Sequence, residues 1–305
     1  MAQTRGLTPA LFDNVDKSVS ALLRKEVREQ PVIYEDYFNI DDSDRKFERK
    51  QIMVPFGDVP EKGEGANYAL DVIKQGGYKD FTAVEFGLGF AVTETALEDD
   101  QYDQLSKSAQ WLAYACKAVQ DKYAVRVQNN GFTTETTADG VAVYSASHVL
   151  GGGGTASNVP TSMVDLSRIS LEQAVIDLQT NTKQESGQLV APQKSFVLLV
   201  HPAEEFNARR ITESDKKPGS ADNDDNVLKS RRWNVVVNPY ISSNDDWFLF
   251  PADKKQHGIL SYKRVPITQV PVMTDPNTGN RIYKIRFRQS WGAWFWQNLY
   301  GSQGA

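Results

Sequence analysis

Few residues of this sequence have the types and spacing that enzyme or metal chemistry requires. The three histidines, His148, His201 and His257, stand at no metal-ligand spacing from one another, and the single cysteine, Cys116, belongs to an apolar stripe. The motifs G-x-S-x-G, G-x-x-x-x-G-K-[ST], H-E-x-x-H and C-x-x-C are all missing. We therefore expect no catalytic centre, no bound metal and no cofactor.

Three weaker signals have ordinary structural interpretations. Gly87–Gly89 follows an expected strand but lacks the third glycine and the helix start of a dinucleotide site. Ser147 and His148 are adjacent in sequence, and adjacent side chains seldom face each other, so His148 is interpreted as a loop histidine. The acidic stretch Asp222–Asp225 lacks the spacing of a calcium loop and is interpreted as solvated.

A basic strand face is the candidate binding surface that the sequence shows. In the expected strand Arg281–Arg288, apolar side chains alternate with basic ones, namely Lys284, Arg286 and Arg288. This period of two places the basic side chains together on one face of a strand. Such a face suits nucleic acid or an acidic neighbour, and a merely solvated face is the alternative.

The composition is that of a globular and mildly acidic protein. With 40% hydrophobic and 24% charged residues, a chain of 305 residues can build a core. Its 34 basic and 39 acidic side chains give a net charge of -5, which argues against a protein whose main task is to grip DNA phosphates. One cysteine forms no intramolecular disulfide, and no apolar run approaches the roughly 20 residues of a membrane span. We expect a reducing compartment and no membrane partner.

Two helices frame the first half of the chain. From Thr8 to Glu29, apolar residues recur every three or four positions, and Pro31 ends the helix. From Asp99 to Asn129 the same spacing continues without glycine or proline, which predicts one long helix. A single apolar stripe of this length is better suited to packing across a sheet than to a coiled coil.

A long hairpin is expected between these helices, from about Gly65 to Thr93. Apolar residues alternate in two segments on either side of Gly76 and Gly77, which we interpret as the turn; these residues are Tyr68, Leu70, Val72, Val84, Phe86, Leu88 and Phe90. The charged segment Asn39–Lys50 has no period and is interpreted as an exposed arm. Because neither this arm nor the following helix can cover both strands, we expect the hairpin to lie over an adjacent subunit.

The second half predicts a loop-rich segment over Gly131–Asn158 and then mixed helices and strands. A helix through Leu171–Leu178, the strand Phe196–Val200 and a helix starting at Pro202 form a compact α/β unit. The last third predicts short strands separated by turns, namely Trp233–Val237, Trp247–Phe250, Ile259–Val265 and Arg281–Arg288. The whole chain is therefore expected to belong to the α+β class.

This order of elements resembles the major capsid proteins of tailed bacteriophages, which share the Hong Kong phage 97-like fold. The local cues are GDVPEKGEGANYAL before the hairpin, SFVLLVHPAEEFNARRI, NPYISSNDDWFLFPADKKQHGILSY and the aromatic-rich ending RFRQSWGAWFWQNLYGSQG. The resemblance implies five segments, which are an N-terminal helix and arm over 1–50, an extended hairpin loop over 51–97, a spine helix and the first part of the peripheral domain over 98–159, an axial domain over 160–232 and a return of the peripheral domain over 233–305.

The resemblance implies a structural protein and not an enzyme. Its copies would self-assemble as hexamers and pentamers into an icosahedral head that encloses double-stranded DNA, with weak non-specific DNA contact. It further implies a scaffolding protein, a portal protein, a decoration protein, assembly in the host cytoplasm and a place in the virion capsid. Because the arm begins at the initiator methionine, the scaffold is expected to be a separate protein or a segment outside this sequence.

Two other functions remain open at this point. The same fold would also suit an encapsulin-like protein compartment, and a soluble α/β enzyme with an unrecognised site is the alternative from another class. Subunits of the family can be cross-linked through a hairpin lysine, and Lys74 and Lys79 lie near the expected turn. No acceptor asparagine or catalytic acid can be matched to them, so cross-linking is left open.

Overall fold

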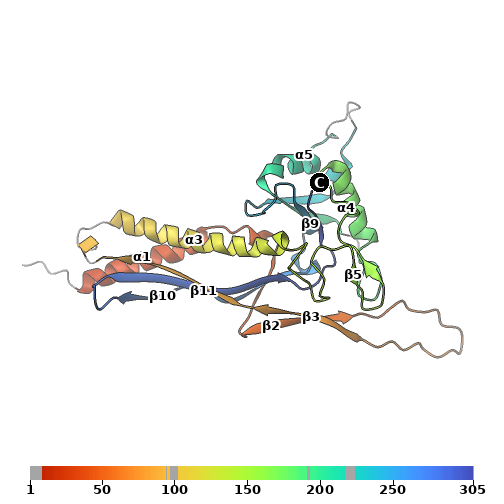
Figure 1. Cartoon of the computed structure of the whole chain (residues 1–305), viewed down its shortest axis with the longest axis horizontal. Helices are drawn as coiled ribbons and strands as arrows, with labels where there is room; N and C mark the ends of the chain where they lie inside the picture. Colours follow the sequence, from red (N-terminus) through yellow and green to blue (C-terminus); the bar gives the residue numbers. More distant parts are fainter. Residues whose placement is uncertain (1–8, 94, 97–101, 191–192, 217–223, 305) are drawn as a thin grey trace, which may run out of the picture.

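The computed structural model describes residues 9–93, 95–96, 102–190, 193–216 and 224–304. Two four-stranded sheets form the body, with the strand orders β1-β10-β11-β4 and β12-β9-β7-β8. Helices lie beside each sheet, and a two-stranded hairpin lies below the first sheet in this view and projects beyond the body (Figure 1). No helix in the described part of the chain combines the length and apolarity needed to cross a membrane.

The first sheet is built on a long antiparallel ribbon. β10 (Ile259–Thr274) and β11 (Arg281–Ala293) pair along most of their length, and both extend beyond the strands predicted there. A turn at Asp275–Gly279 joins them, with Gly279 at a φ of 70° and its N–H donating to the Asp275 carbonyl at 2.9 Å. β1 (Asn39–Asp42) runs parallel to β10, and β4 (Val84–Val92) pairs antiparallel with β11.

Both long helices cover one face of this sheet, as the helical periodicity predicted. α1 (Pro9–Glu29) and α3 (Tyr102–Asn129) pack against each other and against the ribbon (Figure 1). Leu23, Leu112 and Phe287 are buried between the helices and the sheet. The predicted helix positions Thr8 and Asp99–Gln101 lie outside the described residues.

The predicted α/β unit is confirmed, but its sheet draws on two segments of the chain. α4 (Arg168–Thr180) and α5 (Glu205–Glu213) accompany the buried strand β7 (Ser195–Val200). The partners of β7 come from the last third of the chain, namely β8 (Arg232–Val237), β9 (Trp247–Pro251) and β12 (Tyr300–Ser302). Three of the four strands therefore extend past the segment boundary expected at Arg232, and the division into axial and peripheral domains stays a prediction.

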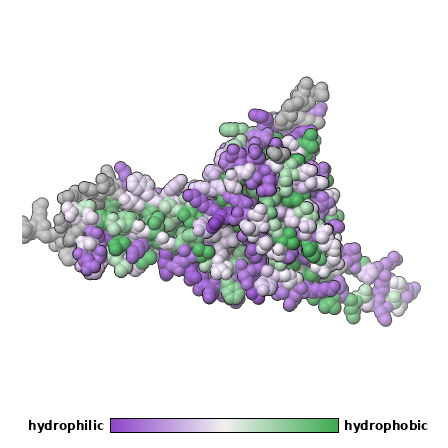
Figure 2. All heavy atoms as spheres, in the orientation of Figure 1, coloured by the Kyte–Doolittle hydropathy of each residue, from purple (hydrophilic) through white to green (hydrophobic). Residues whose placement is uncertain are grey.

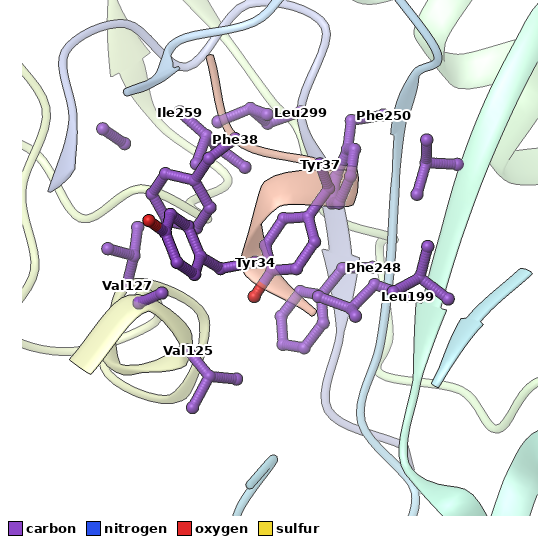
Figure 3. Close-up of a cluster of buried hydrophobic side chains, with 14 of the residues drawn as sticks. Tyr34, Tyr37, Phe38, Val125, Val127, Leu199, Phe248, Phe250, Ile259 and Leu299 are labelled. Atoms are coloured by element: carbon purple, nitrogen blue, oxygen red, sulfur yellow. The ribbon is translucent and has the colours of Figure 1, made fainter. Parts of the chain in front are cut away.

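A cluster of aromatic side chains joins the two halves of the body. Tyr34, Tyr37 and Phe38 follow α1 and are fully buried against valines of α3 and against Leu199, Phe248 and Phe250 of the second sheet (Figure 3). The Tyr34 backbone N–H donates to Asp121 of α3 at 2.9 Å. The chain after α1 is thus fixed within the core.

The expectation of an exposed arm over Asn39–Lys50 is wrong. Asn39–Asp42 forms β1, and Phe47–Val54 forms β2, which pairs with β3 (Lys74–Thr82). Both strands lie at sheet edges, where charged side chains are common, so neither shows a clear alternation of apolar residues in the sequence.

The hairpin exists, but its strands are not the predicted ones. β2 and β3 form it, and the connecting loop spans 55–73. Gly76 and Gly77 lie inside β3 and not at the turn, and a Cβ on Gly77 would stand 1.8 Å from the Ala138 carbonyl oxygen. The glycine pair therefore serves a close backbone approach, which sequence alone does not distinguish from a turn.

The alternating strand Val84–Val92 is also confirmed, yet part of its apolar face is covered within the chain. As β4 it pairs with β11 and not with the segment around Tyr68. Phe86 stacks on Phe287 with ring centroids 4.9 Å apart, and Phe90 stacks on Tyr283 at 5.1 Å. The expectation that this face lacks intrachain cover is therefore wrong for Phe86 and Phe90, because β4 is an edge strand beneath α3, whereas Val84 and Leu88 stay 48% and 52% exposed.

Candidate assembly surfaces

The most catalytic-looking group in the structure is a buried histidine that only holds loops together. His148 Nδ1 lies 2.7 Å from Asp139 Oδ2, and Nε2 lies 3.2 Å from Asn158 Oδ1. Trp296 stacks on the ring with centroids 4.5 Å apart. Burial favours a neutral Asp139, but hydrogen bonds from His148 and Thr137 outweigh it and lower the pKa of that carboxyl. Both ring nitrogens are occupied, so His148 has no nitrogen left to activate a nucleophile.

The other reactive residue types are equally confined. Cys116 is buried in the core beneath α1, and burial raises the pKa of its thiol to about 11. Burial lowers the pKa of His257 to about 4. Asp225 forms an ion pair with Lys216 at 2.8 Å, whereas Asp222 lies outside the described residues. Across the described ranges, no group of three potential metal ligands comes together.

The hairpin loop 55–73 is the most exposed apolar part of the structure. Val59, Tyr68, Leu70 and Val72 are between 73% and 94% exposed. Figure 2 shows apolar residues among polar ones along this projecting arm. The loop also carries four acidic residues and one basic residue, which gives it a net charge of -3. The run GDVPEKGEG, rich in glycine, proline and acidic residues, is the sequence signal that could have identified it as a loop.

Polar contacts hold the base of the hairpin to the body. Arg49 makes two hydrogen bonds with Asp80 across β2 and β3, both at 2.7 Å. Lys79 Nζ lies 3.0 Å from Glu135 and 2.7 Å from the Thr136 carbonyl oxygen. Lys79 is therefore not near the turn, contrary to the expectation, while Lys74 begins β3. The loop projects from a firmly attached stem.

Lys284, Arg286 and Arg288 of β11 share one face, as the period of two predicted. They lie opposite Gly89, Gly87 and Glu85 of β4, on the side of the sheet away from the helices. Glu85 is 3.7 Å from Arg286 and 3.8 Å from Arg288, so it balances part of their charge. Lys284 lies next to Met273 at 3.8 Å.

A groove of about 450 Å³ runs along this open face between β4 and the ribbon. Gly87 and Gly89 form one wall, and Val270, Ile282 and Lys284 contribute to the other. A Cβ on Gly89 would lie 2.8 Å from Lys284 Cγ, so glycine keeps the two strands close and the groove open. In the described part of the chain, no strand pairs with the outer edge of β4.

Comparisons with known proteins agree with this architecture. The family described as phage capsid protein matches residues 78–300. The subunit of the bacteriophage JBD30 procapsid has 15% identity and a TM-score of 0.55, covering 98% of this chain and 77% of its own. The bacteriophage PhiM1 mature capsid has 9% identity and a TM-score of 0.59, covering 90% and 88%. A virus-like particle from Pyrococcus furiosus has 12% identity and a TM-score of 0.53, covering 94% and 98%. The comparison with curated protein sequences gives no match.

The family match covers most of the chain, and the solved structures share its arrangement of helices and sheets. The fold is therefore the α+β, Hong Kong phage 97-like capsid fold that the sequence indicated. The family match, together with the shared capsid fold, shows that copies of this chain associate into capsid shells in the virion. This chain belongs to the phage capsid protein family and is a structural major capsid protein rather than an enzyme.

Proposed function

We propose that this chain assembles as hexamers and pentamers into an icosahedral phage head that encloses double-stranded DNA, and that the hairpin loop of each copy covers a neighbouring copy. One observation carries this proposal. The loop 55–73 exposes a run of large apolar side chains that no other described part of the chain covers. Patches of this kind on a protein that forms shells mark contacts between subunits.

We propose that the hairpin loop binds the open face of β4 and β11 on the neighbouring copy. The loop has a net charge of -3, whereas Lys284, Arg286 and Arg288 outnumber Glu85 on this face. The groove beside Gly87 and Gly89 offers room for apolar side chains. Complementary charge sets the approach and the register, and apolar burial supplies the affinity.

The remaining partners follow from the family. A scaffolding protein would guide assembly in the host cytoplasm, a portal protein would occupy one vertex, and a decoration protein would bind the finished surface. DNA contact would be weak and non-specific, because a chain with a net charge of -5 does not attract phosphates over its whole surface. The family match and the likeness to procapsid and mature capsid structures support this set.

A protein compartment is the second candidate, favoured by the likeness to the virus-like particle of Pyrococcus furiosus. The match to the phage capsid family favours a head instead. The neighbouring genes separate the two functions, because portal and terminase genes accompany a head and not a compartment.

The loop is tested by replacing Tyr68, Leu70 and Val72 with serine and following assembly by electron microscopy. Burying three such side chains contributes about 1.5 to 3 kcal/mol each before association costs, so we expect folded subunits that form no closed shells. The matched control replaces Gly63, Ala66 and Asn67 of the same loop with serine and should assemble normally. Closed shells from the first variant, or loss of its helical circular dichroism, would refute the proposal.

A further inference from the structure

The outer sides of α1 and α3 carry an unusual excess of positive charge. Helices α1 and α3 together have eight basic and six acidic residues, a net charge of +2, so the rest of the chain, within an overall -5, carries -7. Between Asp16 and Glu29 and between Leu105 and Asn129, seven of the eight cations are exposed, but only one of the four carboxylates is; the cations are Lys17, Arg24, Lys25, Arg28, Lys107, Lys122 and Arg126.

Helical spacing places these cations in two stripes that face away from the sheet. On α1, positions 17, 24, 25 and 28 recur at helical intervals, and on α3 positions 107, 122 and 126 do the same. The opposite stripes of both helices are buried on the sheet. Because the helices pack side by side, the two stripes form one surface, which we call the helix-layer surface.

Three of these four carboxylates are engaged elsewhere, whereas six of the seven exposed cations have no carboxylate partner among the described side chains. Asp16 accepts a hydrogen bond from Tyr283 at 2.6 Å, Glu26 accepts one from Gln110 at 3.1 Å, and Asp121 accepts the Tyr34 N–H. Lys25 has Glu29 at 4.0 Å. For the other six exposed cations, no carboxylate of the described residues lies within ion-pair distance; they are Lys17, Arg24, Arg28, Lys107, Lys122 and Arg126. On the open face, by contrast, Glu85 pairs with two arginines.

We propose that the helix-layer surface is the part of the subunit that meets packaged duplex DNA. This inference rests on the proposed function as a head that encloses DNA. The stripe from Lys107 to Arg126 is about 28 Å long at about 1.5 Å per residue, which matches roughly eight base pairs of duplex at about 3.4 Å each. An acidic chain that concentrates cations, most of them without a carboxylate partner, on one surface can neutralise phosphates there while its other surfaces repel them.

Two exposed aromatic residues on α3 raise the alternative of an acidic protein segment as the partner. Trp111 is 67% exposed and Tyr114 is 62% exposed, and both lie between Lys107 and Lys122 on the same stripe. A protein partner would use such rings as its main anchors. Four of the seven cations lie on α1, away from this pair, and this spread favours an extended polyanion.

The test measures binding of unassembled full-length subunits to a fluorescent 30-base-pair duplex of random sequence, by anisotropy at 50 to 200 mM salt. With six phosphate contacts, affinity should fall about 10³-fold over this range. The variant R24Q/R28Q/K107Q/K122Q should reduce the slope of log affinity against log salt by about 3 to 4. The variants K284Q/R286Q/R288Q and W111S/Y114S serve as controls and should leave that slope within about one unit.

Three results would overturn the inference: no duplex binding by the wild-type chain, an equal loss of slope in K284Q/R286Q/R288Q, or loss of binding in W111S/Y114S, which would indicate a protein partner. Electron microscopy of the same wild-type preparation after assembly distinguishes a failure of the DNA-binding inference from a failure of the proposed head. Closed shells from a chain that binds no duplex would refute the inference and leave the proposed head standing. A chain that binds duplex but forms no shells would refute the head instead.

Discussion

The two sides of the first sheet differ in what the chain itself provides to cover them. On the helix side, Phe86, Tyr283 and Phe287 stack beneath α3, and Asp16 reaches down from α1 to the Tyr283 hydroxyl. On the open side, arginines face Glu85 across a groove that no described segment fills. One strand, β11, thus contributes alternate residues to a closed core and to an open surface.

Alternate residues of the same strand can therefore have different roles. One set packs into the core of its own chain, and the other set forms a surface for contact with another chain. Even-numbered positions from Lys284 to Arg288 can change without affecting the core, because their neighbours bury the apolar area. Odd-numbered positions cannot, because they fill space between sheet and helices. Substitutions on β11 should therefore separate stability from assembly.

The largest expected effect comes from Phe287→Ala. Phe287 is 2% exposed, so its removal leaves a cavity under α3 and should cost about 3 to 5 kcal/mol in the free energy of unfolding. The adjacent Arg286→Ala, on the open side, should cost less than about 1 kcal/mol. Urea unfolding of unassembled subunits gives both values. Equal costs would show that the two sides are not distinct.

The buried residue His257 should make the stability of the folded chain depend on pH. Burial lowers the pKa of His257 from 6.5 to about 4, so between these values the unfolded chain binds a proton that the folded chain does not. The contribution of His257 to the free energy of unfolding should thus be fully present above pH 6.5, and about 3 kcal/mol should be lost as the pH drops to 4.

The check is the pH dependence of urea unfolding in His257→Gln, which should lose this part of the slope. A slope unchanged in His257→Gln would show that other groups cause the acid sensitivity.

Tyr283→Phe probes the link between α1 and the sheet. The Tyr283 hydroxyl donates to the Asp16 carboxylate, and hydrogen bonds to charged groups contribute about 1.5 to 3 kcal/mol. Burial and Asp16 both raise the pKa of this phenol, so alkaline pH should weaken the wild type more than the variant. Tyr78→Phe, on exposed β3, is the control for a lost hydroxyl. An unfolding free energy equal to that of wild type would contradict the role of this contact.

The smallest effect is expected from Glu85→Gln, which frees Arg286 and Arg288. Glu85 and Arg286 are half exposed, and both ion pairs are long, at 3.7 and 3.8 Å, so stability should change by less than about 1 kcal/mol. The open side gains positive charge, and shells should therefore form at higher salt than those of wild type. Glu213→Gln on α5 also breaks an exposed ion pair and should leave the salt limit unchanged. If Glu85→Gln lowered the highest salt concentration at which shells form, the acidic hairpin loop would not bind the open side.

Periodicity in the sequence predicted the helices and strands that bury one side against the rest of the chain. The stripes of α1 and α3 and the alternation of β4 and β11 were all recovered, because each element buries one side. Partners of the strands were not predictable in the same way. β4 pairs with β11, almost two hundred residues later, and β2 is an edge strand in which Glu48 and Lys50 conceal the alternation that ends at Ile52 and Val54.

The candidate surfaces were predicted in part for the same reason. The shared face of Lys284, Arg286 and Arg288 follows from a local period, whereas their balance by Glu85 depends on a distant strand. The glycine pair at Gly76 misled the hairpin assignment because a close backbone approach and a turn both favour glycine. Cations of the helix-layer surface are visible in sequence, but their lack of carboxylate partners is a property of the fold.

The most direct test of the account is cryo-electron microscopy of DNA-filled heads at side-chain resolution. We predict that the loop 55–73 of each copy lies over the open side of a neighbour's β4 and β11, with Tyr68 and Leu70 in the groove beside Gly87. On the opposite side of the same sheet, the exposed cations of α1 and α3 should face the outermost layer of DNA. A loop folded onto its own subunit, or helices that face the outside of the shell, would contradict the account.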